Sequence, residues 1–252
     1  MLKYLTLRLS ASSIDAYQTC PRLYQITRLQ KRPEAPSSAQ NIGNLFHAWL
    51  ETWDFKSTPE WAESPKDYDH AYARGLTLAY IESWGKNDAH RISSEEPFTV
   101  EYGDVRISGR LDGVWRLGQR TMVVEHKTTS MDLQLLLRMK SFDRQTALYP
   151  LAAKSLGHDV DCVLLDMVRR PVVKKFGSLD ELVDIVKDRT ECRREELFRT
   201  ERDVEALFHD LDAVIKLMET GVFPRNPTAC YKYGKMCDFH VECANGGTNG
   251  FT

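Results

Sequence analysis

The segments Gly-Arg-Leu-Asp-Gly (109–113) and Val-Glu-His-Lys-Thr (124–128) carry most of the structural information in this chain. Residues 107–111 and 122–124 are rich in β-branched and apolar side chains, which favours two strands. Gly118-Gln119 between them is typical of a two-residue hairpin turn with glycine first. A hairpin centred on that turn places Asp112 directly opposite Glu125.

Two opposed carboxylates indicate a cation site. Directly opposed residues of an antiparallel pair have Cβ atoms about 4.5–5.5 Å apart, and two carboxylates at that separation repel unless a cation lies between them. Because side chains alternate along a strand, we expect Lys127 on the face of Glu125 and the His126 side chain on the other face, away from the site. The alternative is two solvated acids near a turn, with Lys127 as a surface cation.

A helix is expected around residues 41–51, upstream of the hairpin. Its apolar side chains recur at helical spacing and define a buried stripe: Ile42, Leu45, Phe46, Trp49, Leu50 and Trp53. His47 lies at the border of this stripe, where a neutral imidazole is able to ligate a metal ion. The alternative is a partly buried histidine whose hydrogen bonds are satisfied within the protein.

A second helix is expected over residues 142–156, kinked or interrupted at Pro150. Gln145 and Tyr149 are four residues apart and share one face of it. The alternative for this pair is a helix surface with Tyr149 half buried. Arg144 and Lys140 are able to hold phosphates, although for Lys140 a solvated surface charge is the favoured interpretation.

The chain has six cysteines, and three of them crowd into its last stretch. Cys230, Cys237 and Cys243 follow the pattern Cys-x6-Cys-x5-Cys, and thiolates clustered in a loop suggest a metal. The N-terminus does not resemble a signal peptide, so we expect a reducing cytoplasm in which disulfides are disfavoured. Cys162, in a strand-like segment, and Cys192, in a charged helical one, are interpreted as small buried or half-buried residues.

Taken in their order along the chain, these segments resemble the motifs of the RecB-like nucleases of the PD-(D/E)xK superfamily. Asp112 with Glu125-x-Lys127 matches the nuclease core, Gly43-x-x-x-His47 the element before it, and Gln145-x-x-x-Tyr149 the element after it. The resemblance implies an α/β fold with a mixed central sheet flanked by helices and a helical iron–sulfur lobe. It also implies a catalytic role for Asp112, Glu125, Lys127, Gln145 and Tyr149, and DNA contacts from Arg144, Gln145 and Tyr149. Mg²⁺ or Mn²⁺ would be bound by His47, Asp112, Glu125 and the backbone carbonyl of His126.

The segment containing Cys20, residues 9–24, resembles the N-terminal entry of the same family. The resemblance implies that Cys20 joins Cys230, Cys237 and Cys243 to hold a [4Fe-4S] cluster, as in AddB-type nucleases and CRISPR-associated RecB-like exonucleases. Four thiolates suit zinc equally well. The family spacing has Cys-x2-Cys before the final gap, so the identity of the middle ligand stays open.

The expected organisation is one RecB-like domain over residues 1–252. Segments 1–30 and 221–245 would form the iron–sulfur lobe, and residues 41–176 the catalytic core. Residues 179–220 would be helical. Further expectations are a helix over 68–84, a sheet that begins at 98–102, and a strand over 162–168 that pairs with 172–176.

The composition sets broad limits on function. The 252 residues are 42% hydrophobic with a net charge of −2, which argues against a broad basic surface and favours a narrow positive groove if DNA is bound. No apolar run is long enough to cross a bilayer. The resemblance implies an exonuclease acting on single-stranded DNA from an end, with 5′ to 3′ polarity favoured and an endonuclease as the nearest variant.

The setting implied is recombination, repair or CRISPR-type adaptation in the cytoplasm of a bacterium or a phage-infected cell, with partner proteins of those pathways. The sequence leaves the oligomeric state open. One alternative is a catalytically silent DNA-binding or scaffold protein that retains the nuclease fold. Another is a zinc-stabilised protein whose carboxylates are incidental.

Overall fold

The computed structural model describes residues 7–52, 65–85, 89–232 and 235–245. The chain divides into two compact units. The larger unit comprises Pro36–Val100 and Gly109–Val204, and the smaller comprises Met1–Ala35, Glu101–Ser108 and Glu205–Thr252. Each unit is described separately below.

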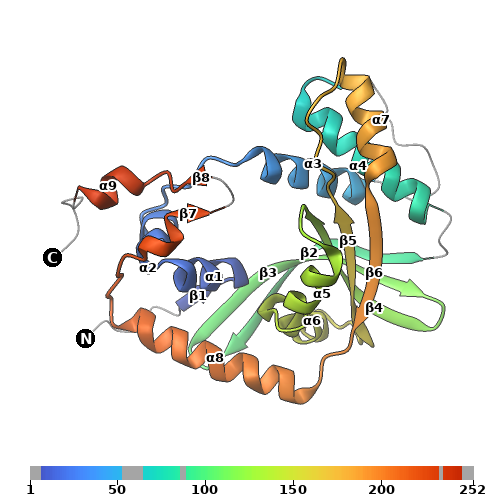
Figure 1. Ribbon diagram of the computed structural model, residues 1–252. Coiled ribbons are helices and arrows are strands. Elements are labelled where there is room, and N and C mark those ends of the chain that lie inside the picture. Colours follow the sequence, from blue (N-terminus) through green and yellow to red (C-terminus); the bar gives the residue numbers. More distant parts are fainter. Residues whose placement is uncertain (1–6, 53–64, 86–88, 233–234, 246–252) are drawn as a thin grey trace. The chain divides into compact units, whose positions relative to one another are not determined.

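A mixed β-sheet forms the centre of the larger unit (Figure 1). β3 and β4 are antiparallel, β4 and β5 parallel, and β5 and β6 antiparallel, while β2 pairs with β3 on its other side. These strands are β2 (His90–Tyr102), β3 (Val105–Leu117), β4 (Arg120–Thr129), β5 (Cys162–Arg169) and β6 (Glu191–Leu197). The α/β class with a mixed sheet flanked by helices, expected from the sequence, is confirmed.

The expected hairpin is confirmed. Leu117 pairs with Arg120 across the turn, and Gly113 pairs with Val124 at the other end of the ladder. Gly118 adopts a φ of 62°, a left-handed conformation that glycine accommodates without strain. Continued by one residue, this register brings Asp112 opposite Glu125.

Two helices cover one face of the sheet and connect the parallel strands β4 and β5. They are α5 (Leu133–Lys140) and α6 (Arg144–Ser155), and α6 runs through Pro150 as a single helix. Leu133 and Leu136 of α5 pack against Leu165 and Met167 of β5. A parallel pair needs such a crossover, and β5 is accordingly buried from Cys162 to Val168.

Three helices pack around Val168, whose side chain points to the face of the sheet opposite the one that α5 and α6 cover. They are α3 (Ser38–Thr52), α4 (Tyr68–Trp84) and α7 (Leu179–Arg189). The helix expected at 68–84 is confirmed, as is the buried stripe of α3, in which Phe46 is fully buried. Trp53 lies outside the described residues.

The expectation of a helical region over 179–220 is wrong in its middle part. β6 separates α7 from α8 (Glu201–Glu219), so Cys192 lies on a strand. The charged composition of β6 favours a helix, but its pairing with β5, which directs Arg194 to the buried Asp166, overrides this preference. Residues 172–176 are not in a strand, and the strand expected from residue 98 is β2, which begins at His90.

The smaller unit joins N-terminal and C-terminal segments. The Arg32 guanidinium donates to both carboxylate oxygens of Glu242 at 2.9 and 2.7 Å, and the Ala35 amide donates to Asp238. Its elements include β1 (Leu7–Leu9), which pairs with the start of β3, α1 (Ala11–Thr19), α2 (Pro21–Tyr24), the π-helix η1 (Gln25–Leu29), the 3-10 helix η3 (Pro227–Ala229), β7 (Tyr231–Lys232), β8 (Lys235–Met236) and α9 (His240–Ala244). Within the described part of the chain, no helix is both long and apolar enough to cross a membrane.

Candidate active site

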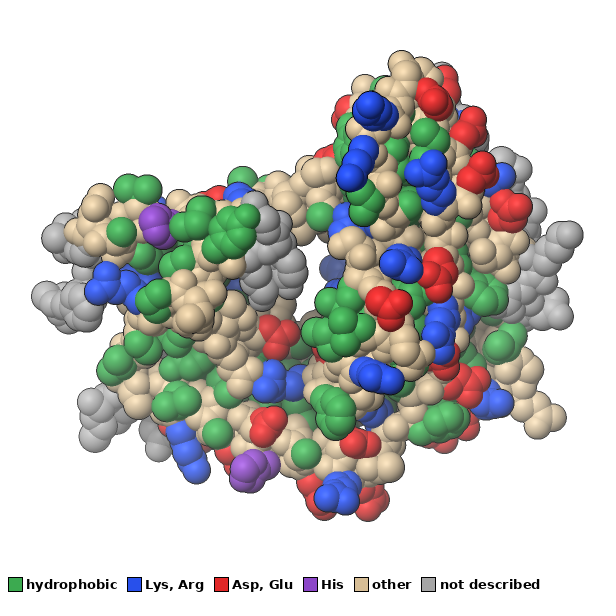
Figure 2. All heavy atoms as spheres, in the orientation of Figure 1, with side chains coloured by type: hydrophobic (Ala, Val, Ile, Leu, Met, Phe, Trp, Pro, Cys, Tyr) green, Lys and Arg blue, Asp and Glu red, His purple; other side chains and the backbone are tan. Residues whose placement is uncertain are grey.

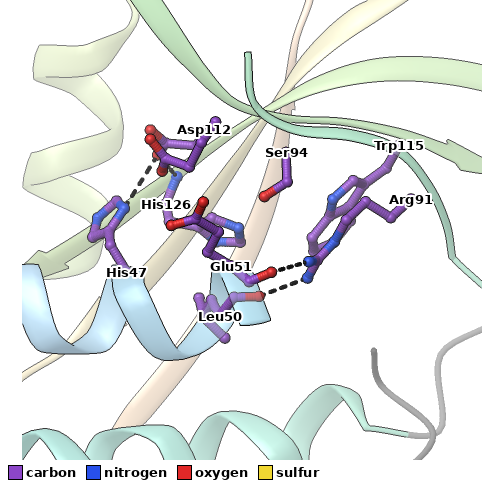
Figure 3. Close-up of a pocket in the computed structure, with 9 residues that line it drawn as sticks. His47, Leu50, Glu51, Arg91, Ser94, Asp112, Trp115 and His126 are labelled. Atoms are coloured by element: carbon purple, nitrogen blue, oxygen red, sulfur yellow. Dashed lines mark hydrogen bonds and ion pairs between the residues drawn. The ribbon is translucent and has the colours of Figure 1, made fainter. Parts of the chain in front are cut away.

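His47 and Asp112 approach each other from a helix and a strand of the larger unit (Figure 3). His47 is on α3 and its Nδ1 lies 3.7 Å from Oδ2 of Asp112 on β3. The same Oδ2 accepts a hydrogen bond of 2.9 Å from the backbone amide of His126. The structure therefore brings together the border histidine of α3 and the acidic residue of the hairpin.

The close approach of α3 to β4 depends on Gly43, one turn before His47. A Cβ added at Gly43 would lie 3.2 Å from Oγ1 of Thr128, which is tighter than an ordinary van der Waals contact. The Gly-x-x-x-His spacing thus has a local physical reason. A small residue lets the helix reach the strand, and the histidine one turn later faces the site.

Glu125 is held on the face of the sheet that α6 covers. The hydroxyl of Tyr149 donates to Oε2 of Glu125, and Nε2 of Gln145 donates to the same oxygen at 3.3 Å. Gln145 also donates to the Tyr149 hydroxyl at 2.6 Å. The pair predicted to share one helix face therefore acts on Glu125 as a unit.

Two lysines lie near the acids. Lys127 lies two residues after Glu125 on β4, so its side chain is on the same face of the sheet as that of Glu125. Lys140 is buried, and its Nζ lies 2.9 Å from Asp143 and 3.9 Å from Oε1 of Glu125. The expectation of a solvated Lys140 was wrong, because the turn between α5 and α6 folds its side chain inward.

Both the backbone and the ring of His126 contribute to the candidate active site. The backbone amide of His126 donates to Oδ2 of Asp112 at 2.9 Å, so this backbone faces the site. The His126 ring lies on the face of the sheet opposite the Glu125 side chain, where it packs against Tyr80 and Trp115. It nevertheless lines the small cavity beside His47, so the expectation that the His126 side chain stays away from the site was wrong.

Glu95 is a further residue of the site, one that the sequence did not predict. One ligand atom each from His47, Glu95 and Asp112 all lie within 4.8 Å of one another. Glu95 is in the middle of β2 with a φ of 49°, a left-handed conformation that is uncommon for a residue with a side chain. A conformation of this kind is invisible in the sequence, where Glu95 is one of two consecutive glutamates.

Burial and charge shift the ionisation of this site. Burial raises the pKa of Asp112 well above its usual range, and the negative charge of Glu125 raises it further. Burial lowers the pKa of His47 to about 3, and the charges of His126 and Lys127 act in the same direction. A neutral imidazole beside crowded carboxylates is suited to bind a cation.

A second group of residues lies in the smaller unit. Cys20, Cys230, Cys237 and Cys243 line one cavity of about 470 Å³. Within the described part of the chain, no three of their sulfurs lie within 4.8 Å of one another. Cys162 and Cys192 lie on β5 and β6 of the larger unit.

The family model of the PD-(D/E)XK nuclease superfamily matches residues 8–244. This chain belongs to the PD-(D/E)XK nuclease superfamily. Nucleases of this superfamily use a divalent metal ion. His47, Glu95 and Asp112 offer one imidazole nitrogen and two carboxylate oxygens, a donor set that fits such an ion.

Two solved structures resemble this chain, and the first of them shares its overall fold. A candidate exonuclease from Eubacterium rectale aligns with a TM-score of 0.56 and 11% identity, over 96% of this chain and 94% of that one. A phage-related exonuclease from Haemophilus somnus 129PT aligns with a TM-score of 0.45 and 14% identity, over 86% of this chain and 97% of that one. No protein with a curated description matches this member of the superfamily.

Proposed function

We propose that this chain is a metal-dependent deoxyribonuclease that hydrolyses phosphodiester bonds. The observation that carries the proposal is the convergence of three kinds of group where β3 meets β4. These are the carboxylates of Asp112 and Glu125, the imidazole of His47 and the ammonium group of Lys127, which follows Glu125 by two residues on β4. Metal-assisted hydrolysis of a phosphodiester uses these groups together.

Each residue has a distinct part in the proposed reaction. His47, Asp112, Glu125 and the backbone carbonyl of His126 would hold Mg²⁺ or Mn²⁺. When bound, the cation lowers the pKa of the attacking water and withdraws charge from the scissile phosphate. Lys127 orients that water or takes its proton, and its charge offsets the negative charge that develops on the phosphate. The imidazole ligand favours Mn²⁺, since imidazole suits softer ions than Mg²⁺.

Gln145 and Tyr149 position Glu125 in this proposal. Both donate to Oε2, which leaves Oε1 as the carboxylate oxygen directed at other partners. Hydrogen-bonded supports of this kind fix the orientation of a ligating carboxylate. Arg144, at the start of the same helix α6, would contact the DNA strand.

Single-stranded DNA is the proposed substrate. Phe142, in the turn before α6, is 91% exposed, and Met139 and Leu135 beside it on α5 are also exposed. Exposed aromatic and apolar side chains provide stacking surfaces for unpaired bases. On the face that Figure 2 shows, Lys and Arg side chains are interspersed with Asp and Glu, which fits a local phosphate path better than a broad duplex-binding surface. Action from an end with 5′ to 3′ polarity rests on the resemblance to RecB-like exonucleases.

The test is digestion of 5′- and 3′-end-labelled DNA, single- and double-stranded, with Mn²⁺ or Mg²⁺. We expect cation-dependent loss of single-stranded DNA from the 5′ end by the native protein and no cleavage by Asp112→Asn or Lys127→Ala. Asp184→Asn and Lys154→Ala change exposed residues of the same types and should retain activity. Full activity of Asp112→Asn would refute the proposal. DNA binding without cleavage by the native protein would favour the silent scaffold.

Base stacking has its own test. Phe142→Ala should weaken binding of single-stranded DNA roughly 5- to 150-fold, since stacking of one base contributes about 1–3 kcal/mol. Duplex binding should change little. Phe176→Ala is the control, because Phe176 is partly exposed next to Tyr68 of α4. Equal weakening for both forms of DNA would contradict the assignment of Phe142 to unpaired bases.

We also propose that Cys20, Cys230, Cys237 and Cys243 hold a [4Fe-4S] cluster. A mononuclear zinc site brings four sulfurs within about 3.8 Å of one another, given Zn–S bonds of about 2.3 Å. A four-iron cluster spaces its sulfurs more widely, because each thiolate binds a different iron. The four cysteines line one cavity, and the choice of a cluster over zinc rests on the resemblance to RecB-like nucleases.

Protein purified without oxygen should be brown with broad visible absorption and contain about four iron atoms per chain. Cys20→Ser and Cys237→Ser should lose the colour, whereas Cys192→Ala should keep it. A colourless protein with one zinc would overturn the cluster. We propose a structural role for it, in which it ties the segments 1–30 and 221–245 together.

The proposed setting is recombination, repair or CRISPR-type adaptation in the bacterial cytoplasm or a phage-infected cell, with proteins of those pathways as partners. The resemblance to AddB-type and CRISPR-associated nucleases supports it. Copurification of tagged protein from its host, followed by mass spectrometry, tests this setting. Recovery of recombination or adaptation proteins would support it, and their absence from a pull-down that retains the tagged protein would count against it.

A further inference from the structure

The segment that runs from the end of β5 to α7 concentrates positive charge. It reads Arg-Arg-Pro-Val-Val-Lys-Lys-Phe (169–176), so half of its residues are Lys or Arg and none is acidic. In the whole chain, 34 of 252 residues are Lys or Arg and the net charge is −2. The ordinary interpretation is a solvated surface, but a local excess of positive charge is also typical of a surface that binds a polyanion.

The segment begins beside the candidate active site. β5 runs parallel to β4, with Lys127 paired with Met167 and Thr129 with Arg169. The Arg170 amide donates to the Thr129 carbonyl oxygen at 2.6 Å and so extends this contact beyond the strand. With about 4.8 Å between strands and about 3.3 Å per residue along them, the Cα atoms of Arg169 and Lys127 are roughly 8 Å apart.

Arg169 shares a face of the sheet with the proposed catalytic groups. Side chains alternate along a strand, so Arg169 is on the same face as Met167, which packs against α5. Glu125 is on this face too, since it accepts hydrogen bonds from two residues of α6. The first cation of the segment therefore continues the face that carries Glu125 and Lys127.

Packing within the larger unit holds the segment in place. The Tyr72 hydroxyl donates to the Pro171 carbonyl oxygen, and Val173 packs against the cluster formed by α3, α4 and α7. Lys174 and Lys175, which follow Val173, are exposed. A backbone that is already held in place loses little conformational entropy when its exposed side chains bind a ligand.

The positive charges of the segment are available to an external anion. Among the residues that the structure describes, neither Lys174 nor Lys175 has an acidic partner. Arg169 lies 3.3 Å from Glu191, and the two side chains are 44% and 53% exposed. An exposed ion pair of this kind contributes about 0–1 kcal/mol, so a phosphate is able to replace Glu191.

Lys and Arg side chains gather on the surface of the larger unit along this segment (Figure 2). The acids that follow it, Asp180 and Glu181, are in the first turn of α7. Glu181 accepts a hydrogen bond from the Gly177 amide, so its carboxylate is directed at the backbone. The positive surface therefore ends where α7 begins.

We propose that Arg169, Lys174 and Lys175 form a phosphate-binding surface for single-stranded DNA that leads to the site at Lys127. Arg169 would bind the phosphate nearest the site, and the two lysines would bind phosphates further along the same strand. A narrow line of cations fits the backbone of one flexible strand. That this DNA is the substrate rests on the proposed nuclease function, whereas its binding by these residues does not.

The test is the affinity for a fluorescent single-stranded oligonucleotide, measured by anisotropy in chelator at about 50–200 mM KCl, a range over which phosphate contacts weaken strongly. Each lost contact lowers the slope of log affinity against log salt by about 0.7. We expect the slope to fall by roughly 1.4 in Lys174→Ala/Lys175→Ala, and by roughly 2 when Arg169→Ala is added.

The control variant Lys154→Ala/Lys216→Ala removes the same charge from exposed positions on α6 and α8 and should keep the native slope. Circular dichroism checks that each variant is folded. A native protein that does not bind the oligonucleotide would overturn the proposal. So would a Lys174→Ala/Lys175→Ala protein with the native slope.

Protection of lysines from acetylation provides a second readout, one that uses the native protein. Single-stranded DNA should slow the acetylation of Lys174 and Lys175 and leave Lys154 and Lys216 as reactive as in the free protein. Mass spectrometry of digested protein measures the four rates. Equal protection of both pairs would contradict a local surface.

Cleavage kinetics separate this proposal from the proposed function. In an active nuclease, Lys174→Ala/Lys175→Ala should raise KM and leave kcat unchanged, because it removes binding that substrate and transition state share. A protein that binds single-stranded DNA through these lysines without cleaving it would refute the nuclease function and leave this proposal standing. An active nuclease whose double variant keeps the native slope would do the reverse.

Discussion

The Tyr149 hydroxyl donates a hydrogen bond to Oε2 of Glu125 and so ties helix α6 to strand β4. Burial, together with the charges of Glu125 and Asp112, raises the pKa of Tyr149 well above its usual value. The phenol therefore stays protonated and remains a donor at neutral pH. Through this bond, a residue of the crossover helix fixes the orientation of a carboxylate in the proposed cation site.

Replacement of Tyr149 by phenylalanine removes that donor and keeps the ring. We expect Tyr149→Phe to lower cation affinity or turnover roughly 10- to 100-fold, the usual cost of losing a hydrogen-bonded support of a metal ligand. Tyr68→Phe, at the partly exposed start of α4, should change neither. Mn²⁺ titration and cleavage kinetics measure both effects. Unchanged values for Tyr149→Phe would show that Gln145 alone positions Glu125.

Arg194 neutralises a carboxylate in the core. Asp166 is fully buried, and its Oδ2 accepts from Tyr80 at 2.5 Å and from Arg194 Nε at 3.1 Å. Arg194→Met leaves that charge without its cation, so we expect a loss of about 3–5 kcal/mol in the free energy of unfolding. Arg193→Met removes a partly exposed ion pair on the same strand and should lower the free energy of unfolding by about 0–1 kcal/mol. Urea denaturation compares the two, and equal losses would contradict this role.

Gly75 sets the separation of α4 and α7. A Cβ at this position would lie 2.7 Å from the Val183 carbonyl oxygen and from Cβ of Val186. Gly75→Ala should lower stability by about 1–3 kcal/mol through overpacking, despite the better helix propensity of alanine. At Gly177, the nearest atom to an added Cβ is the flexible Glu181 carboxylate, so Gly177→Ala is the control. Thermal unfolding of both variants provides the comparison, and a Gly75→Ala protein as stable as the native one would contradict this packing.

The half-buried His47 predicts a pH dependence of stability in cation-free protein. Its pKa is lowered from 6.5 to about 3, so between these values the unfolded chain binds a proton that the folded chain does not. The contribution of neutral His47 is therefore complete above pH 6.5 and lost as the pH falls toward 3, at up to about 1.4 kcal/mol per pH unit.

The difference in unfolding free energy between native protein and His47→Gln isolates this contribution from the other titrating groups. It should shrink or reverse as the pH falls from 7 to 4. His209→Gln is the control, because His209 is 89% exposed on its side chain. A difference that stays constant over this range would contradict the half-buried, neutral state of His47.

Local pattern was sufficient to predict the hairpin and several helices. Gly118 in a two-residue turn fixed the pairing of β3 with β4, and period-3.6 spacing located α3 and α4. These elements depend on interactions between residues close in sequence. Gln145 and Tyr149 belong to the same class, since their shared face follows from helix geometry alone.

The features that were missed depend on contacts between distant segments. β6 has the composition of a helix, and its strand conformation comes from pairing with β5 and from the Arg194 contact with Asp166. Glu95 reaches the site through a left-handed backbone in β2. Lys140 is buried because the turn before α6 folds over it. None of these contacts is encoded in the spacing of neighbouring residues.

Anomalous diffraction from crystals soaked in Mn²⁺ locates a bound cation itself. We expect a manganese peak within coordination distance of the Asp112 carboxylate in the native protein, and its loss in Asp112→Asn crystals grown under the same conditions. Manganese peaks that avoid Asp112, or one that persists there in Asp112→Asn, would refute a cation site at Asp112.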